Sequence, residues 1–364
     1  MVDLSKPYLS KSTDDLNNGS FLFNCQNGTL DLKTGGFNGH KRSDFLTQIA
    51  GVDFNASSKC PRFNKFIDEI FDGDIELAHY VQTMCGYCLT GKTNEQKMFL
   101  LYGNGANGKG TLIEVVKSIM GSYASTAQAE TLMQKAKVSG GEASPDIARL
   151  VDTRAVMLAE GDRSHHFNEA FVKQLTGQDT VTARELYGKP FEFQPAFKLL
   201  LSTNYLPKVR GTDEGIWRRL TPIPFKVSFK GNQMDKNLRA VLLSEGPGIL
   251  NWMIEGCNRW QKEGLIEPSS IIKSRATYQS DSDNIIRFLE DVTIKNSEAT
   301  ITKSGLYLNY QKWVKLEGEY YTAPNREFSK IIGDQAHIVE SRTKEARNWK
   351  GIEFQPNERG WCSL

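Results

Sequence analysis

The stretch "GNGANGK" at residues 103–109 combines glycines with a lysine at the spacing of a phosphate-binding loop. Gly103, Gly105 and Gly108 are expected to let backbone N–H groups converge on one anion, and Lys109 would neutralise the β- and γ-phosphates of a nucleotide. The apolar run before the stretch and the amphipathic run after it indicate a buried strand and a helix. The sequence therefore predicts a nucleotide site formed by Gly103, Asn104, Gly105, Ala106, Asn107, Gly108, Lys109, Gly110 and Thr111.

The motif departs from its usual form directly after the lysine. Gly110 occupies the position where a Ser or Thr hydroxyl ordinarily binds Mg²⁺, and Thr111 follows one place later. One residue along a helix turns a side chain by about 100°, so Thr111 is a candidate for a phosphate contact instead. Mg²⁺ would then rely more on acids and water, and the hydroxyl ligand stays unassigned.

Polar side chains follow two further apolar runs. "RAVMLAEGD" ends in Glu160 and Asp162, and "FKLLLSTN" ends in Asn204. Parallel strands bring their carboxyl ends to one edge of a sheet, beside the phosphate-binding loop. Glu160 and Asp162 are therefore candidate Mg²⁺ ligands, Glu160 could also orient the attacking water, and Asn204 could hold that water against the γ-phosphate.

Two adjacent arginines, Arg218 and Arg219, follow the "FKLLLSTN" run. Arginines in this position suggest an arginine finger. Such a side chain reaches the nucleotide bound by a neighbouring subunit and stabilises the charge of the transition state there. The alternative is that one of them pairs with Asp213 or Glu214.

The order of the patterns predicts the organisation of the chain. Residues 1–60 form a leader with short strands, paired across Asn-Gly and Thr-Gly-Gly turns, and residues 61–95 have helical spacing. In residues 96–230 the strand patterns "KMFLLYG", "RAVMLAE", "FKLLLSTN" and "RRLTPIPF" alternate with helix patterns, which predicts an α/β core with a largely parallel sheet. Residues 231–283 indicate a helical extension and linker, and residues 284–364 have the size of a winged-helix module.

Composition indicates a globular protein with 364 residues, 39% of them apolar. The apolar runs fall short of the roughly 20 residues that span a bilayer, the start has no signal-peptide pattern, and six scattered cysteines fit a reducing compartment, so we expect a cytoplasmic location.

The net charge is only +2, but residues 184–239 hold eleven Lys and Arg against five Asp and Glu. That excess fits a nucleic-acid surface or an ordinary solvated face.

Two short motifs suggest metal sites but have simpler explanations. Cys85 and Cys88 form the only CxxC, and a zinc site would need a second pair of ligands, so two buried helix residues are favoured. Asp72 and Asp74 lie between helical patterns around a glycine, which favours a turn and an N-cap. The aromatic residues Tyr307, Tyr310, Trp313 and Trp349 are expected in a core rather than stacked on bases.

Four ordered stretches resemble the helicase region of phage and plasmid primases, within the superfamily 3 helicases of the AAA+ type. They are "NGTLDLKTG", "CGYCLTGKTNEQKMFLLYGNGANGKGT", "VKQLTGQDTVTARELYGKPFEFQPAFKLLLSTNYLP" and "RGTDEGIWRRLTPIPF". The resemblance extends more loosely through "NIIRFLEDV", "LYLNYQKWV" and "RNWKGIEF". It implies an AAA+ P-loop ATPase core with a parallel sheet, a small helical collar before it and a winged-helix-like domain after it.

The resemblance also assigns roles to individual residues. Lys109 would be the Walker A lysine, Glu160 the Walker B acid, Asn204 the sensor asparagine, and Arg218 or Arg219 the finger. A hairpin into the channel of a ring would have its tip at residues 186–190, with Gly188 supplying the turn. Lys189 would reach a DNA phosphate there, supported by Arg184 and Tyr187, although Tyr187 could equally serve in packing.

The implied activity is ATP- and Mg²⁺-dependent translocation of a hexameric ring along single-stranded DNA, 3′ to 5′, at a fork, in a bacterial or archaeal host cell. Residues before Asn27 are too few for the paired-carboxylate domain of a primase, so we expect a portion of a longer chain or a free-standing helicase, with a primase or polymerase as a further partner. Two alternatives stay open: an ATPase that remodels proteins, and an origin-binding module that binds nucleotide without hydrolysis, which Gly110 favours.

Overall fold

The structure, a computed structural model of the chain, describes residues 15–133, 144–159, 167–209, 214–231, 235–317, 322–343 and 346–355. The chain divides into two compact units, Met1–Arg275 and Ala276–Leu364. Each unit has a hydrophobic cluster of its own. Within the described ranges, no helix is both long and apolar enough to cross a membrane.

Short strands at the start of the described chain pair in the predicted order. β1 (Leu22–Cys25) is antiparallel to β2 (Gly28–Asp31), which leaves Gln26 and Asn27 as the turn. β2 is also antiparallel to β3 (Phe37–Asn38), beyond the Thr-Gly-Gly signal. Both hairpin connections are confirmed, although the first turn lies one residue before the Asn-Gly pair.

The next segment is helical, as predicted, and its first helix is capped from far along the chain. α2 (Pro61–Phe71) begins with a proline and has no side-chain cap of its own. The Glu245 carboxylate accepts the N–H groups of Arg62 at 3.0 Å and Phe63 at 2.9 Å. A carboxylate is favourable there because the free N–H groups and the helix dipole both attract negative charge.

α3 (Ile75–Cys88) confirms the simpler explanation of both short motifs. The Asp74 carboxylate accepts the N–H of Leu77 at 3.0 Å and caps this helix. Cys85 and Cys88 are buried within it, and burial raises the pKa of the Cys88 thiol to about 11.

A parallel sheet occupies the centre of the first unit, in the order β10-β4-β9-β6-β5. Four of its strands were predicted as apolar runs, and β5 was missed because its sequence, ASTAQ, is mostly polar or small. The strands are β4 (Met98–Tyr102), β5 (Ala124–Gln128), β6 (Ala155–Ala159), β9 (Lys198–Thr203) and β10 (Leu220–Pro224).

β10 contains two prolines, Pro222 and Pro224, yet belongs to the sheet. It is an edge strand that pairs with β4 alone. Prolines two residues apart place their missing N–H groups on the same side of a strand, and an edge strand needs donors on one side only. The same prolines prevent a further strand from pairing with this edge.

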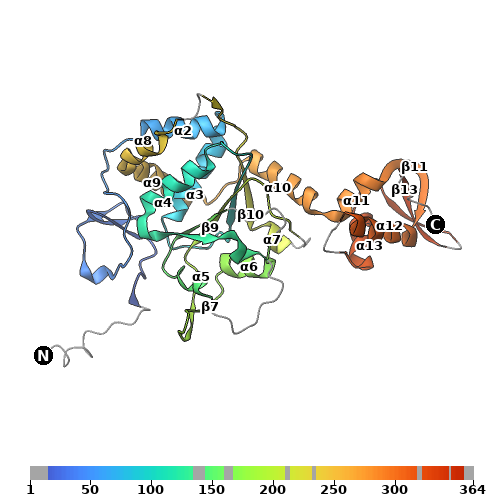
Figure 1. Cartoon of the computed structure of the whole chain (residues 1–364), viewed down its shortest axis with the longest axis horizontal. Helices are drawn as coiled ribbons and strands as arrows, with labels where there is room; N and C mark the ends of the chain where they lie inside the picture. Colours follow the sequence, from blue (N-terminus) through green and yellow to red (C-terminus); the bar gives the residue numbers. More distant parts are fainter. Residues whose placement is uncertain are drawn as a thin grey trace. The chain divides into compact units, whose positions relative to one another are not determined.

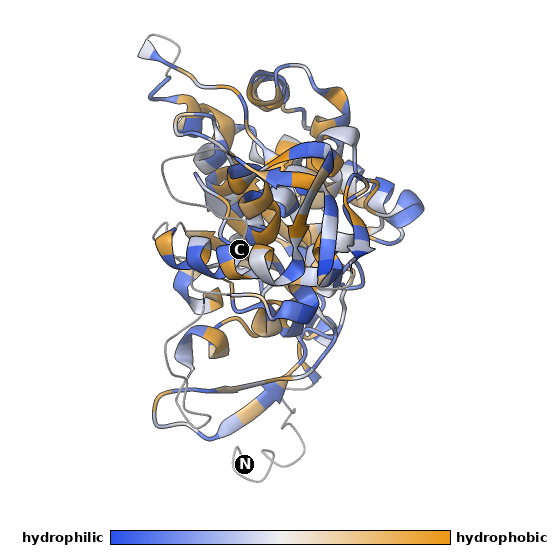
Figure 2. Ribbon diagram, turned by 90° about the vertical axis from the view of Figure 1, so that its right-hand side faces the viewer, coloured by the Kyte–Doolittle hydropathy of each residue, from blue (hydrophilic) through white to orange (hydrophobic). Residues whose placement is uncertain are grey.

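Helices surround the sheet on both sides (Figure 1). α2, α3, α4, α8 and α9 gather on one side, and α5, α6 and α7 lie on the other together with the antiparallel hairpin of β7 (Val181–Arg184) and β8 (Pro190–Phe193). Hydrophilic and hydrophobic residues alternate along most helices (Figure 2), as one buried and one solvated face require. The further bounds are α4 (Lys109–Met120), α5 (Pro145–Ala148), α6 (Glu169–Thr176), α7 (Glu214–Trp217), α8 (Leu238–Ser244) and α9 (Gly246–Glu263).

Two buried cations lie where the sheet strands begin. Arg154 donates to the carbonyl oxygens of Leu89 at 2.5 Å and Leu22 at 2.7 Å. The Lys198 ammonium donates to the carbonyl oxygens of Thr90 and, at 3.3 Å, Lys92. Burial lowers the pKa of Lys198 from its ordinary value to about 7. These side chains satisfy carbonyl groups just beyond the end of α3, which otherwise have no helical partner.

The second unit packs helices on a small antiparallel sheet. Its strands have the order β11-β13-β12, and α10 (Ser269–Ser282) spans the division between the units. Tyr310, Trp313 and Trp349 are buried in its core and Tyr307 packs against them, as predicted. The elements are α11 (Asn284–Val292), β11 (Thr293–Thr302), α12 (Lys303–Leu316), α13 (Asn325–Gly333), β12 (Val339–Arg342) and β13 (Arg347–Phe354).

Glu245→Gln tests the remote cap of α2. The amide offers one acceptor oxygen and no charge, so we expect the free energy of unfolding to fall by about 1 kcal/mol in urea titrations. Glu263→Gln is the control. Glu263 is exposed at the end of α9, the helix that begins directly after Glu245, and its substitution should change the free energy of unfolding little. Equal stability of both variants would contradict the capping role.

Lys198→Met tests the buried ammonium through the pH dependence of stability. Above pH 7 the folded state releases the Lys198 proton, whereas the unfolded chain keeps it until its ordinary pKa near 10.5. The unfolded state therefore binds more protons in this window, and the intact chain gains stability relative to the variant as pH rises, by up to about 1.4 kcal/mol per pH unit. A difference that stays constant between pH 7 and 10 would contradict the lowered pKa.

Candidate functional site

The glycine-rich loop (residues 103–108) joins the strand and the helix that the sequence predicted. β4 ends at Tyr102 and α4 begins at Lys109. β4 lies between β9 and β10, so the loop leaves the carboxyl edge of the sheet with a strand end on either side. In α/β sheets this edge is where ligands bind.

Two of the three glycines are required by the backbone. Gly103 has φ 146°, and a Cβ there would lie 2.2 Å from the carbonyl oxygen of Phe225. Gly108 has φ 88°, and a Cβ there would lie 2.4 Å from Ile70 Cγ2 in α2. Gly105, in contrast, faces open space and has no left-handed conformation, so the backbone does not require a glycine at this position. The left-handed residue is its neighbour Ala106, with φ 58°.

Lys109 is buried and its ammonium lies among oxygen atoms of the loop and the neighbouring strand. It donates to the carbonyl oxygen of Gly103 at 2.5 Å, to Asn107 Oδ1 at 3.2 Å and to Asn204 Oδ1 at 3.5 Å. The predicted neighbours Lys109, at the start of α4, and Asn204, directly after β9, are thus brought together. An anionic oxygen would form a stronger, charge-assisted bond with the same ammonium.

Asn107 holds the loop in shape, a role that the sequence did not reveal. Its side-chain amide donates to the carbonyl oxygen of Asn104 at 2.5 Å and to that of Phe225 at 3.4 Å, while Oδ1 accepts from Lys109. The side chain is buried, so it fixes the loop from within. Any residue type at this motif position is allowed by the pattern alone, which explains why its role was missed.

The acidic residues predicted beside this site, Glu160 and Asp162, lie outside the described residues. Their strand, β6, ends at Ala159 and pairs with β9, which ends beside the loop. In the described part of the chain there is no group of three His, Cys, Asp or Glu that could hold a metal ion. Gly110 is exposed, with no atom within 4 Å of an added Cβ.

Arg218 and Arg219 lie at the opposite, amino edge of the sheet, immediately before β10. Arg218 is exposed, whereas Arg219 is buried and donates to the carbonyl oxygen of Gly215 at 2.6 Å. The side-chain oxygen of Gln96 accepts from both guanidinium groups, at 3.1 Å and 3.3 Å. Gln96 has φ 53°, an unusual value for a residue with a side chain, and its part in holding these arginines was not predicted.

The β7–β8 hairpin places the predicted tip residues on the surface. Leu186, Tyr187 and Lys189 are exposed, and the Tyr187 side chain is fully so. The N–H of Gly188 donates to the carbonyl oxygen of Glu185 at 3.1 Å, which closes the turn.

The residue that makes this turn is not the expected glycine. Tyr187 has φ 62°, and Gly188 has an ordinary conformation, so the assignment of the turn to Gly188 is wrong. Position three of such a turn favours Gly or Asn, and a tyrosine there is strained. Arg184 donates from Nε to the carbonyl oxygen of Gly188 at 3.2 Å and thereby braces the tip.

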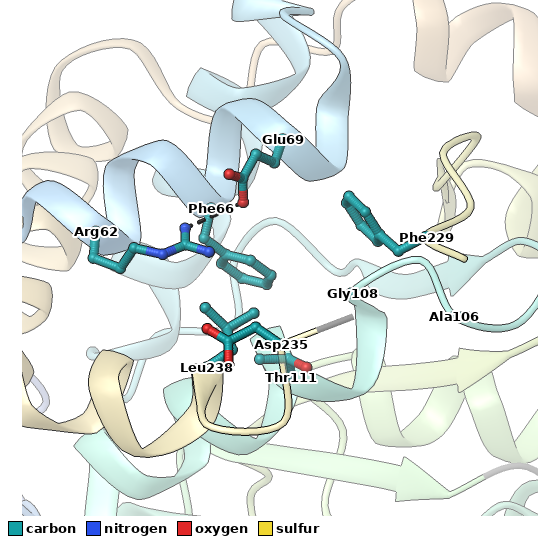
Figure 3. A pocket seen from close by; sticks show the side chains of 9 residues that line it. All are labelled: Arg62, Phe66, Glu69, Ala106, Gly108, Thr111, Phe229, Asp235 and Leu238. Atoms are coloured by element: carbon teal, nitrogen blue, oxygen red, sulfur yellow. Dashed lines mark hydrogen bonds and ion pairs between the residues drawn. The ribbon is translucent and has the colours of Figure 1, made fainter. Parts of the chain in front are cut away.

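A cavity of about 160 Å³ opens beside the glycine-rich loop. Figure 3 shows the Arg62 and Glu69 side chains of α2 joined by an ion pair of 3.1 Å, above the Phe66 ring. Thr111 lines this cavity, and its predicted phosphate contact stays a prediction. The remaining lining residues are Ala106, Gly108, Phe229, Asp235 and Leu238.

Two family models match parts of the chain. The model described as D5 N terminal like matches residues 1–72, and a family of unknown function (DUF5906) matches residues 101–219. The second match therefore covers the glycine-rich loop, Asn204 and both arginines.

Relatives of the chain are viral proteins that carry helicase or primase names. "Putative helicase L207/L206" of Acanthamoeba polyphaga mimivirus is 30% identical over 324 residues, which cover 83% of this chain and 34% of that protein. "Putative primase C962R" of African swine fever virus (strain Badajoz 1971 Vero-adapted) is 24% identical over 371 residues, which cover 94% of this chain and 37% of that protein. The chain thus spans little more than a third of the length of these relatives.

The fold is similar to that of a solved structure, the A form apo structure of the NrS-1 C-terminal region (305–718). The TM-score is 0.51 at 13% sequence identity, and the match covers 85% of this chain and 79% of that chain. At this identity the likeness concerns the arrangement of helices and strands.

Alanine substitutions in the glycine-rich loop should separate the glycines that the backbone requires from the one it does not. Gly108→Ala forces a left-handed alanine against Ile70 and should lower the free energy of unfolding by more than about 1 kcal/mol. Gly105→Ala faces open space and should be nearly neutral. Denaturant titrations measure both, and equal losses would contradict the loop geometry.

Proposed function

Since this chain belongs to the phage and viral primase-helicase family, we propose that it is an ATP-dependent replicative DNA helicase, the helicase part of a primase-helicase. The observation that carries the proposal is the position of Lys109. Its ammonium is buried between the loop backbone and Asn204, at the sheet edge where an anion can replace neutral acceptors. We propose that the β- and γ-phosphates of ATP bind there.

The hydrolysis step would use groups from three adjacent strand ends. Lys109 binds phosphate oxygens, and the Asn204 amide orients the attacking water. We retain Glu160 and Asp162 as the Mg²⁺ ligands, which is a proposal from the sequence and the family. Bound Mg²⁺ would neutralise phosphate charge, and no described side chain is assigned to it.

The architecture of the proposed enzyme follows from the order of its elements. The parallel sheet with the loop after β4 supports an AAA+ P-loop core over residues 96–230, with residues 61–95 as a helical collar. In the second unit, the succession α11, β11, α12, α13, β12, β13 supports a winged-helix-like domain. We propose that this domain contacts DNA, a primase or an initiator.

The arginines support a ring in which ATP lies between subunits. β10 has five residues at about 3.3 Å each, so roughly 17 Å of strand separates Arg218 from the loop of its own subunit. Arg218 is exposed and Arg219 is buried, which favours Arg218 as the finger. A cation at that distance can stabilise transition-state charge only on a neighbour's nucleotide, and a six-membered ring supplies that neighbour.

The hairpin is the proposed contact with single-stranded DNA. Lys189 is exposed next to a fully exposed tyrosine, so a phosphate and a base could be held together. Strain of the kind seen at Tyr187 collects at functional sites, which supports a role for its ring beyond packing. Movement of successive hairpins would advance the strand, with 3′ to 5′ polarity proposed from the family resemblance.

ATP hydrolysis with and without single-stranded DNA tests the proposal. DNA should stimulate the intact chain severalfold, Lys109→Ala should abolish hydrolysis, and Lys189→Ala should lose the stimulation by DNA. Lys262→Ala, an exposed lysine in α9, is the matched control and should behave like the intact chain. Binding of ATP without hydrolysis, even on DNA, would instead support a nucleotide switch, the alternative that Gly110 favours.

Mixed rings test whether the arginine acts on a neighbour. Lys109→Ala and Arg218→Ala chains should each be inactive alone, and their mixture should regain activity because about a quarter of randomly formed interfaces then have both groups intact. The double variant in one chain should not be rescued. A mixture as inactive as the double variant would contradict an arginine supplied by a neighbouring subunit.

A further inference from the structure

The cavity beside the glycine-rich loop has features that phosphate binding does not require. Its volume, about 160 Å³, is smaller than the several hundred Å³ that enclose a whole small-molecule ligand, so it suits one planar ring system. Gly108 and Thr111 form one of its edges. A ligand with phosphates at Lys109 would therefore extend its other end into this cavity.

Aromatic and aliphatic side chains give the cavity an apolar lining. Phe66 is buried in α2 and packs against Gly108, where an added Cβ would lie 3.2 Å from its ring. Phe229 is partly buried on the opposite side (Figure 3), and its N–H donates to the carbonyl oxygen of Ala106 at 2.7 Å. This bond fixes the Phe229 segment to the loop, so the ring is positioned for stacking on a base.

One carboxylate faces this apolar lining without belonging to the ion pair of α2. Asp235 lines the cavity, and its Oδ1 accepts the N–H of Asn237 at 2.8 Å. A carboxylate can only accept hydrogen bonds, and it has two oxygens, so it suits a ligand group that donates N–H. The exocyclic amino group of a purine is such a donor.

We infer that this cavity binds the base of an aminopurine nucleotide, with Phe229 stacking on the ring and Asp235 accepting its amino group. The inference rests on the proposed function and deepens it by assigning the part of the substrate that selects the nucleotide. It also makes α2, from the helical segment before the sheet, part of the nucleotide site. Base binding then joins this helix to the loop that holds the phosphates.

Diphosphates test the inference without hydrolysis, because ADP and purine riboside 5′-diphosphate differ only in the amino group. In calorimetric titrations of the full chain with Mg²⁺, ADP should bind about tenfold more tightly, as expected for a hydrogen bond to a charged acceptor. Asp235→Ala should remove this tenfold difference. Pyrophosphate should bind the intact chain and the variant equally, which shows that the phosphate site is unchanged.

Two controls keep the result specific. Asp72→Asn changes an acid at the end of the same helix α2, outside this cavity, at a left-handed position that asparagine tolerates, and should keep the tenfold difference. Phe229→Leu should weaken the binding of ADP and of purine riboside 5′-diphosphate alike, since it removes stacking and keeps an apolar contact.

The outcomes separate this inference from the proposed function. Equal binding of ADP and purine riboside 5′-diphosphate to the intact chain would overturn the role of Asp235 while leaving the phosphate site in place. A folded chain that binds none of the three ligands would overturn both proposals.

Discussion

The glycine-rich loop depends on a contact in which no side chain fits between Gly108 and helix α2. Ile70 and Phe66 of that helix occupy the space that a Cβ would need. The left-handed backbone at Gly108 is what turns the chain into α4 and brings Lys109 to its position. Because the Glu245 carboxylate caps α2, a residue far along the sequence also supports this geometry. The loop is therefore shaped by the helices before and after it as much as by its own sequence.

Features of the molecule that depend on local patterns could be predicted from the sequence. Apolar runs gave β4, β6, β9 and β10, and the spacing after the loop gave α4. Parallel pairing then brings Asn204 to Lys109, since strands of one sheet share an edge. Strand β5 was not predicted, because an edge strand needs few apolar residues and its sequence, ASTAQ, contains few.

Features that depend on distant residues or on a few degrees of backbone rotation could not be predicted. Gln96 meets Arg218 across more than a hundred residues, and no periodicity records such a pair. Ala106 and Tyr187 adopt left-handed conformations although each has a glycine, Gly105 or Gly188, as its neighbour. A glycine in a turn indicates that some residue near it is left-handed, and the hydrogen bonds of the turn decide which.

Edge strand β10 links the two ends of the site mechanically. Beyond its carboxyl end, the carbonyl oxygen of Phe225 lies against Gly103, and before its amino end come Arg218 and Arg219. The strand is paired with β4 in register throughout, and the bonds continue past both ends, from Phe225 N–H to Tyr102 and from Met98 N–H to Arg219. An extended strand held in this way cannot shorten or stretch, so it fixes the distance between its two ends. β10 therefore sets how far the arginines lie from the loop, across the length of the sheet.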